Sequence, residues 1–149
     1  MPSLIFELDQ QQFAIGINFV EEVLPFVPAR QIPQVPAIVE GIVNLRGSAL
    51  PVLNIRARFG LPPTPPALSD HLIVVRISGR KLALHVDRAN SVVELSARSV
   101  TDVAAIVAGS RYISGVAQVD GDIIFIHDPE LFLREAELAA LAEFGMAAS

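Results

Sequence analysis

Two stretches of the sequence follow the same pattern, and this internal repeat limits the folds open to the chain. Residues 41–59 align with residues 115–133, so that glycine falls on glycine at 41/115 and 47/121 and apolar residues coincide at 45/119, 50/124 and 52/126. A weaker similarity aligns residues 13–17 with residues 82–86, and the two pairs of similar segments occur in the same order in both halves. Self-similarity of this kind predicts two equivalent structural units.

Each half contains two predicted β-hairpins. Apolar and β-branched runs flank short polar turns at 9–11, 78–81 and 120–121, and the Asp-Gly pair of the last turn suits the positive φ angles of a tight hairpin. Gly47 and Ser48 are expected to form the fourth turn. The predicted strands span residues 3–8, 12–17, 41–45, 49–55, 71–77, 82–86, 112–119 and 123–126. Two hairpins alone bury too little surface, so we predict an all-β (mainly β) fold of two pseudo-equivalent β-barrels packed together.

Prolines mark the connections between these hairpins. They cluster at 25, 28, 33 and 36 and again at 62, 63, 65 and 66, where neither a helix interior nor a central strand is expected. The second cluster is the predicted connection between the halves. Within a single domain over 1–149, we expect the first barrel mainly from residues 15–65 and the second mainly from 70–130. A short helical turn is predicted at 56–60 and a C-terminal helix at 134–146.

The composition is apolar and narrows the possible functions. The 149 residues are 52% hydrophobic and 18% charged, against about 25% charged in average soluble domains. The longest charge-free stretches, 10–20 and 59–69, are shorter than the ~20 apolar residues of a membrane span. No secretory signal pattern is present, so a cytoplasmic location is expected. The net charge of −5 argues against a nucleic-acid partner, and the absence of cysteine excludes disulfides and thiolate metal sites.

The residues best suited to chemistry form no recognised motif. They are the three histidines, His71, His85 and His127, with Asp87 and Asp128. Strand alternation places His85 and Asp87 on one face, but metal-ligand spacings, a nucleophile elbow and a phosphate-binding loop are all missing. We therefore predict no catalytic, cofactor or metal site. The alternative is a small β-barrel ligand-binding or hydrolytic protein that uses His85, Asp87 and His127.

The repeat region itself resembles a known family. The sequence Gly-Ile-Val-Asn-Leu-Arg-Gly at 41–47, followed by residues 50–61, is similar to the signature of CheW-like chemotaxis coupling proteins. Residues 13–15 and 20–23 resemble the family's second strand and the turn after it, 85–87 its Val-Asp step, and 112–131 its closing hairpin. The resemblance covers residues 3–133. Two positions depart from the family pattern, His127 in place of an apolar residue and Ala89 in place of a common valine.

The resemblance implies two intertwined five-stranded barrels of the SH3-like type and a protein that is not an enzyme. Such adaptors bridge the cytoplasmic tip of a chemoreceptor to the regulatory domain of a histidine kinase, in flagellar or type IV pilus systems. By position, the receptor-binding groove would contain Val20, Glu22, Ile38, Val39, Arg46 and Val93.

Among these residues, Arg46 is the strongest candidate, because its guanidinium group can pair bidentately with receptor carboxylates; the alternative is a turn arginine that binds local carbonyls. Val20, Val39 and Val93 would form an apolar floor, or else are plain core residues. Ser48 and Asp120, at the hairpin turns, are the candidates for kinase contact.

Overall fold

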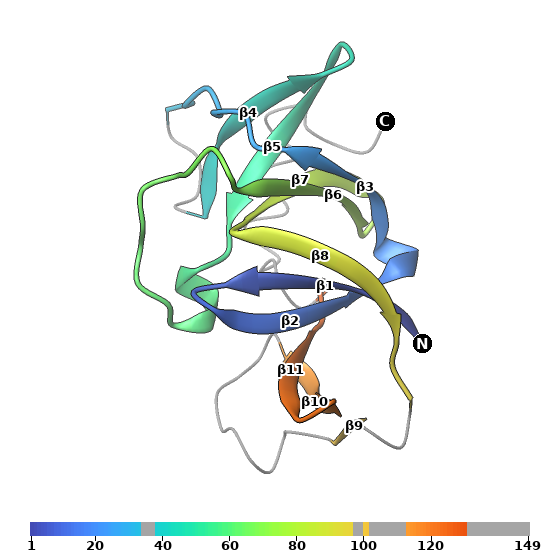
Figure 1. Cartoon of the computed structure of the whole chain (residues 1–149). Coiled ribbons are helices and arrows are strands. Elements are labelled where there is room, and N and C mark those ends of the chain that lie inside the picture. Colours follow the sequence, from blue (N-terminus) through green and yellow to red (C-terminus); the bar gives the residue numbers. More distant parts are fainter. Residues whose placement is uncertain (34–37, 97–99, 102–112, 131–149) are drawn as a thin grey trace.

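Eleven β-strands make up most of the part of the chain that the computed structural model describes, which is residues 1–33, 38–96, 100–101 and 113–130 (Figure 1). The predicted C-terminal helix at 134–146 lies outside these residues. The short turn predicted at 56–60 is present as the 3-10 helix η2 (Ala57–Phe59), and a second one, η1, spans Ile17–Phe19. The strands are β1 (Pro2–Leu8), β2 (Gln11–Gly16), β3 (Val20–Pro25), β4 (Val39–Leu45), β5 (Ser48–Asn54), β6 (His71–Ile77), β7 (Arg80–Val86), β8 (Arg88–Glu94), β9 (Val100–Thr101), β10 (Ile113–Val119) and β11 (Asp122–His127).

The strands form two mixed sheets, each of which draws on both halves of the sequence. One sheet has the order β3-β6-β7-β5-β4, and the other has the order β8-β1-β2-β11-β10-β9. The β5–β6 connection (residues 60–70) therefore separates the two sequence halves without separating the two sheets. The first hairpin of each half lies beside the second hairpin of the other half, and a parallel strand pair joins them in both sheets, β5 with β7 and β11 with β2.

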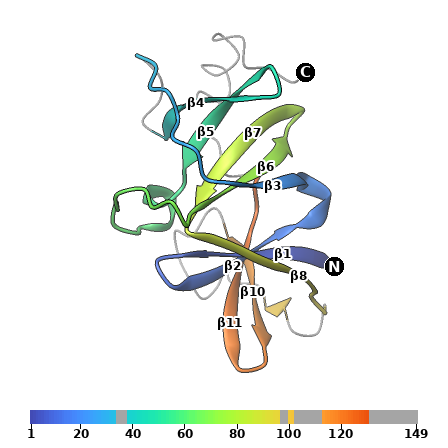
Figure 2. The ribbon, with the colours of Figure 1, turned by 45° about the horizontal axis from the view of Figure 1, so that its top comes forward.

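The internal repeat is reproduced in the strand pairing. In the repeat alignment β4 and β5 correspond to β10 and β11, and both hairpins contain a register shift at the same place. The shift lies between Val39 and Gly41 in one hairpin and between Ile113 and Gly115 in the other. The two hairpins lie at opposite ends of the molecule (Figure 2). The two halves of the chain thus correspond in their hairpins, in the position of the register shift and in the order of their strands.

All four predicted hairpins are present, with one change at a turn. Asp9–Gln10, Ser78–Gly79 and Asp120–Gly121 have positive φ angles, as two-residue hairpin turns require. The fourth turn was expected at Gly47 and Ser48, but it consists of Arg46 (φ 49°) and Gly47 (φ 86°). Ser48 is the first residue of β5. The turn therefore lies one residue earlier than expected, because Arg46 adopts the left-handed conformation that glycine adopts more readily.

Three strands, β3, β8 and β9, are additions to the predicted set. All three are edge strands of their sheets. Along β3, partly buried and exposed residues alternate, and β8 is mostly exposed. Residues 20–23, expected in a turn, belong to β3, where Glu22 lies opposite Val74 of β6. Edge strands of this kind carry no continuous apolar run, which is why composition did not reveal them.

The hydrophobic core has three parts, so most inner strands are buried on both faces. The largest cluster lies between the sheets and includes Phe6 and Phe13, whose rings stack with centroids 5.5 Å apart. A second cluster belongs to the six-stranded sheet and contains Ile5, and a third belongs to the five-stranded sheet and contains Val74. Successive residues of one strand thus point into different clusters. This double burial accounts for the apolar composition without a membrane.

Candidate functional site

Arg46, the strongest candidate from the sequence, projects from the tip of the β4–β5 hairpin and pairs with Glu22 on β3. Its Nη2 donates a hydrogen bond to Glu22 Oε1. The Arg46 side chain is 66% exposed, whereas that of Glu22 is 29% exposed. The hydrogen bond and the charge of Glu22 raise the pKa of Arg46 above its ordinary value. Glu22 therefore orients an arginine that keeps most of its surface open to a partner.

The neighbouring carboxylate, Glu21, has different partners on the same strand. Its Oε1 accepts a hydrogen bond from Arg76 Nε at 3.0 Å, and its Oε2 lies 3.2 Å from Lys81 Nζ. Partial burial disfavours the charged carboxylate, but these two cations outweigh it and lower the pKa of Glu21. Glu21 thus ties β3 to the β6–β7 hairpin, while Glu22 ties β3 to the β4–β5 hairpin.

The apolar residues predicted for the groove differ in exposure. Ile38 and Val39 are each 7% exposed and belong to the core between the sheets, so they offer little surface to a partner. Val20 is partly buried against the same cluster, and Val93 is partly buried against the cluster of the six-stranded sheet. Of the six predicted groove residues, the described contacts bring together Glu22 and Arg46.

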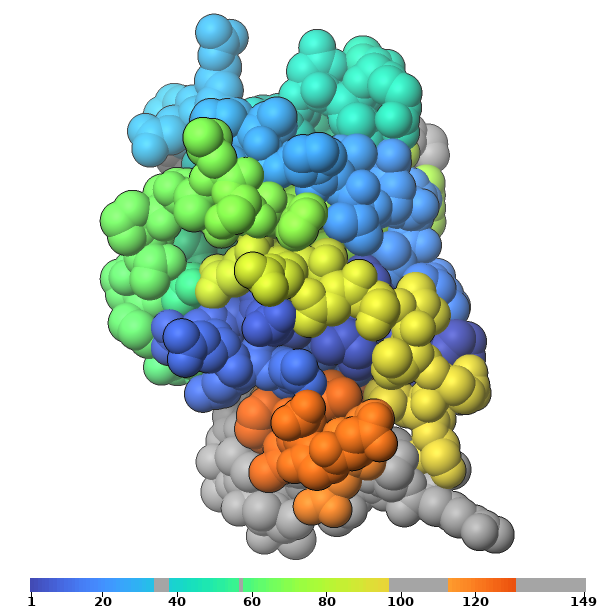
Figure 3. Space-filling view, in the orientation of Figure 1, coloured from blue at the N-terminus to red at the C-terminus, as the bar shows by residue number. Residues whose placement is uncertain are grey.

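Ser48 and Asp120 are both exposed, next to or within equivalent hairpin turns. Ser48 begins β5 after the Arg46–Gly47 turn, and Asp120 lies in the β10–β11 turn with φ 50°. The space-filling view shows the two hairpins at the two ends of the molecule, teal at the top and orange at the bottom (Figure 3). A partner that contacted both residues would have to span the molecule, so the two positions define two separate surfaces.

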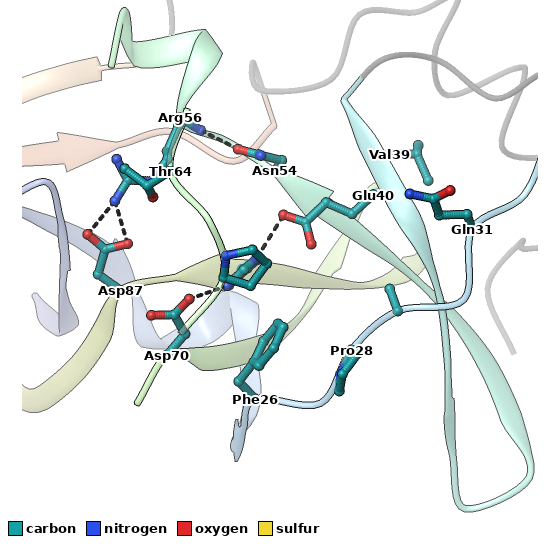
Figure 4. A pocket seen from close by; sticks show the side chains of 13 residues that line it. Phe26, Pro28, Gln31, Val39, Glu40, Asn54, Arg56, Thr64, Asp70 and Asp87 are labelled. Carbon is teal, nitrogen blue, oxygen red and sulfur yellow. Dashed lines mark hydrogen bonds and ion pairs between the residues drawn. The ribbon is translucent and has the colours of Figure 1, made fainter. Parts of the chain in front are cut away.

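A cavity of about 420 Å³ lies on another face, between the β5–β6 connection and the segment after β3 (Figure 4). His85 lies in its wall, with Nδ1 2.8 Å from Glu40 Oε1 and Nε2 2.7 Å from Asp70 Oδ2. Phe26 stacks on the imidazole ring at a centroid distance of 4.6 Å. No local sequence pattern indicates these three neighbours of His85, because they come from separate elements that the fold brings together.

A second charged pair, Arg56 and Asp87, lines the same cavity. Arg56 is 8% exposed, and its Nη2 donates to both carboxylate oxygens of Asp87 at 2.6 and 2.5 Å. Its Nη1 donates to the Pro62 carbonyl at 3.1 Å. Asp87 Oδ2 also accepts from the backbone N–H of Asp9 at 2.8 Å. This pair joins the β7–β8 corner, the β1–β2 turn and the start of the β5–β6 connection.

His127 is absent from the lining of this cavity, although the alternative ligand-binding or hydrolytic function would need it beside His85 and Asp87. It is 2% exposed, its ring meets Phe6 and Phe59 edge-on, and burial lowers its pKa to about 3. Among the described residues, no three His, Asp or Glu side chains are placed to hold a metal ion. The geometry therefore gives no support to a site built from these three residues.

No helix in the described ranges is long and apolar enough to cross a membrane.

Comparisons with known proteins agree on one family. The model of the CheW-like domain matches residues 2–137. The chemotaxis protein CheW of Rhizobium meliloti is 31% identical over 123 residues, which cover 81% of this chain and 79% of the relative. The chemotaxis protein CheW of Treponema pallidum is 29% identical over 143 residues, covering 92% and 84%. The crystal structure of the scaffolding protein TtCheW from Thermoanaerobacter tengcongensis superposes with a TM-score of 0.81 at 29% identity, covering 90% of this chain and 93% of that one.

Proposed function

The chain belongs to the family of CheW-like domains, and from this we propose that it is a non-enzymatic adaptor that couples chemoreceptors to a chemotaxis-type histidine kinase. In this proposal it works in the cytoplasm, is recruited to membrane-associated receptor arrays, and binds the receptor's cytoplasmic tip and the kinase's regulatory domain. It neither enters the membrane nor binds nucleic acid, and the pathway is a flagellar or a type IV pilus system. The two sheets are proposed to be SH3-like barrels, followed by the C-terminal helix at 134–146.

The observation that carries this proposal is the exposed guanidinium group of Arg46, held by Glu22 at the edge of the five-stranded sheet. A planar guanidinium that is largely exposed can bind the carboxylates of a receptor helix. Val20 and Val93, both partly exposed, would contact apolar side chains of that helix. Ile38 and Val39 would support this surface from the core. Ser48 and Asp120 stay candidates for kinase contact.

The proposal is tested by titrating the intact protein, in separate experiments, with a receptor-tip hairpin and with the kinase regulatory domain, using calorimetry. Arg46→Glu should weaken receptor binding at least tenfold, because the reversed charge repels acidic groups. The matched control is Arg88→Glu, a charge reversal at another exposed arginine, which starts β8 beside the β5–β6 connection. Absence of binding to both partners at high micromolar concentration would contradict the adaptor function.

A charge swap separates the role of Arg46 in binding from its role in the fold. The double variant Glu22→Arg, Arg46→Glu restores the ion pair with reversed polarity. We expect its thermal stability to return toward that of the wild type while receptor binding stays weak. Recovery of receptor affinity in the double variant would show that the ion pair matters and that Arg46 does not contact the receptor.

A further inference from the structure

His85 lies between two carboxylates that reach it from different elements. Glu40 belongs to β4, His85 to β7, and Asp70 ends the β5–β6 connection. Both ring nitrogens are within 2.8 Å of a carboxylate oxygen. A neutral imidazole has one N–H donor and one acceptor, and an ionised carboxylate only accepts. Two such contacts need two donors, so the geometry calls for the doubly protonated, positively charged ring.

Asp70 also holds the end of the β5–β6 connection in place. Its Oδ2 accepts a hydrogen bond from the Ala67 N–H at 3.0 Å, and its own N–H donates to the Ala67 carbonyl at 3.0 Å. Its carbonyl accepts from the Phe26 N–H at 3.1 Å. The carboxylate that contacts His85 is therefore the same group that fixes the connection and the segment after β3.

Little apolar burial helps to hold the connection. Residues 62–69 are all exposed, and Leu68 is 90% exposed. At the start of the connection, Arg56 binds the Pro62 carbonyl, and Arg56 is itself paired with Asp87. At its far end, the connection is held by Asp70, and the contact of Asp70 with His85 is lost when the ring gives up a proton.

We propose that His85 is a proton-operated latch: the doubly protonated ring holds Asp70 and Glu40 together and keeps the β5–β6 connection against the five-stranded sheet, and loss of one ring proton releases the connection. After that loss, a nitrogen lone pair faces a carboxylate oxygen. Asp70 gives way, because it lies on an exposed connection, whereas Glu40 lies within a strand. The cavity beside His85 then widens on the Thr64 and Pro66 side.

The charged groups around the ring set the direction of this switch. Burial disfavours the charged ring, but the hydrogen bonds and charges of Glu40 and Asp70 outweigh it, so the pKa of His85 lies above its ordinary value of 6.5. Arg56 and Asp87, the other charged groups in the cavity wall, neutralise each other. The stabilisation is complete below the unfolded-state pKa and is lost as pH rises through the folded-state pKa. The latch is thus closed in acid and opens in alkali.

The β5–β6 connection lies on the opposite side of the molecule from the N-terminus and η1 (Figures 1 and 2). The latch concerns a different feature from the Arg46 surface of the proposed adaptor function, so either proposal can fail alone.

The test is a pH titration of the intact protein by nuclear magnetic resonance. The ring signals of His85 should titrate above 6.5, and the amide signals of Ala67, Leu68 and Asp70 should move with the same midpoint. Amide exchange at Ala67 should accelerate several-fold beyond its intrinsic pH dependence across that midpoint. A His85 midpoint at or below 6.5, or a higher midpoint without a change at Ala67, would overturn the latch.

Variants separate the latch from other ionisations. Asp70→Asn keeps an acceptor for the Ala67 N–H but removes a charge, so the His85 midpoint should fall. His85→Gln should abolish the pH step at Ala67 and leave that amide poorly protected at every pH. The matched control is His71→Gln, which should preserve the step. A step that persists in His85→Gln would refute the proposal, and if that variant does not fold, the wild-type and Asp70→Asn titrations still decide.

Discussion

Two histidines of this chain respond to pH in opposite directions because their surroundings differ. His85 lies between carboxylates, which favour its charged form, whereas His127 is enclosed by the rings of Phe6 and Phe59, where burial lowers its pKa to about 3. His127 is therefore neutral in the folded protein at neutral pH and takes up a proton on unfolding in acid. Its contribution to stability is present above pH 6.5 and is lost as the pH falls from there toward 3.

This difference predicts a specific acid sensitivity. Between about pH 6 and pH 3, His127 should lower the free energy of unfolding by about 1.4 kcal/mol per pH unit. The measurement is urea unfolding of the wild type and His127→Leu at pH 7, 5 and 4. Below about pH 6, the free energy of unfolding of His127→Leu should fall less steeply with falling pH than that of the wild type, by the same amount per pH unit. The control His71→Gln replaces a partly exposed ring and should retain the wild-type slope. If the free energy of unfolding depends on pH equally in the wild type and in His127→Leu, His127 is not the source of the acid sensitivity.

Some residues of the candidate site could be predicted from the sequence, and others could not. Arg46 could be found through the resemblance, because a distinctive motif surrounds it. Its partner Glu22 and the cluster around His85 depend on strand register and on the path of the β5–β6 connection. Glu40, Asp70 and His85 are far apart in the sequence, so no local pattern could place them together.

At the scale of elements, the ion pair between Asp87 and Arg56 ties the corner after β7 to the rest of the fold. Asp87 bonds the nearly buried Arg56 and the turn between β1 and β2. Asp87→Ala would leave the Arg56 charge buried without this partner, which costs about 3–5 kcal/mol. Chemical denaturation should show this loss, and Asp122→Ala, at an exposed aspartate that begins β11, should change stability by less than about 0.5 kcal/mol. A loss below 1 kcal/mol for Asp87→Ala would show that solvent replaces the carboxylate.

The elements differ in how well the sequence predicted them. The four hairpins were found because each combines apolar strands with a turn that needs positive φ angles. β3 and β8 were missed because an edge strand has one hydrogen-bonded neighbour and carries polar side chains. The turn at Arg46 and Gly47 was placed one residue late because glycine is the usual signal for that conformation, and here arginine precedes it.

At the scale of the whole molecule, the exchange of hairpins makes the two sheets interdependent. Each sheet takes strands from both sides of the β5–β6 connection. A protein cut between Pro66 and Ala67 should therefore stay assembled, with the circular dichroism spectrum of the intact chain. After denaturation and separation, neither fragment should show a cooperative unfolding transition, and mixing them should restore it. The cut requires a protease site inserted between Pro66 and Ala67, and the uncut protein with this site is the control. A fragment that folds alone would refute the interdependence of the two sheets.

The exchange also changes what the β5–β6 connection contributes. Because the halves repeat the same hairpins, two separate half-chains could in principle build both sheets, but their assembly would weaken on dilution. The covalent link presents each half to the other at an effective concentration of the order of millimolar. It turns a bimolecular assembly into a unimolecular one, so the equilibrium between folded and unfolded chains does not depend on how much protein is present.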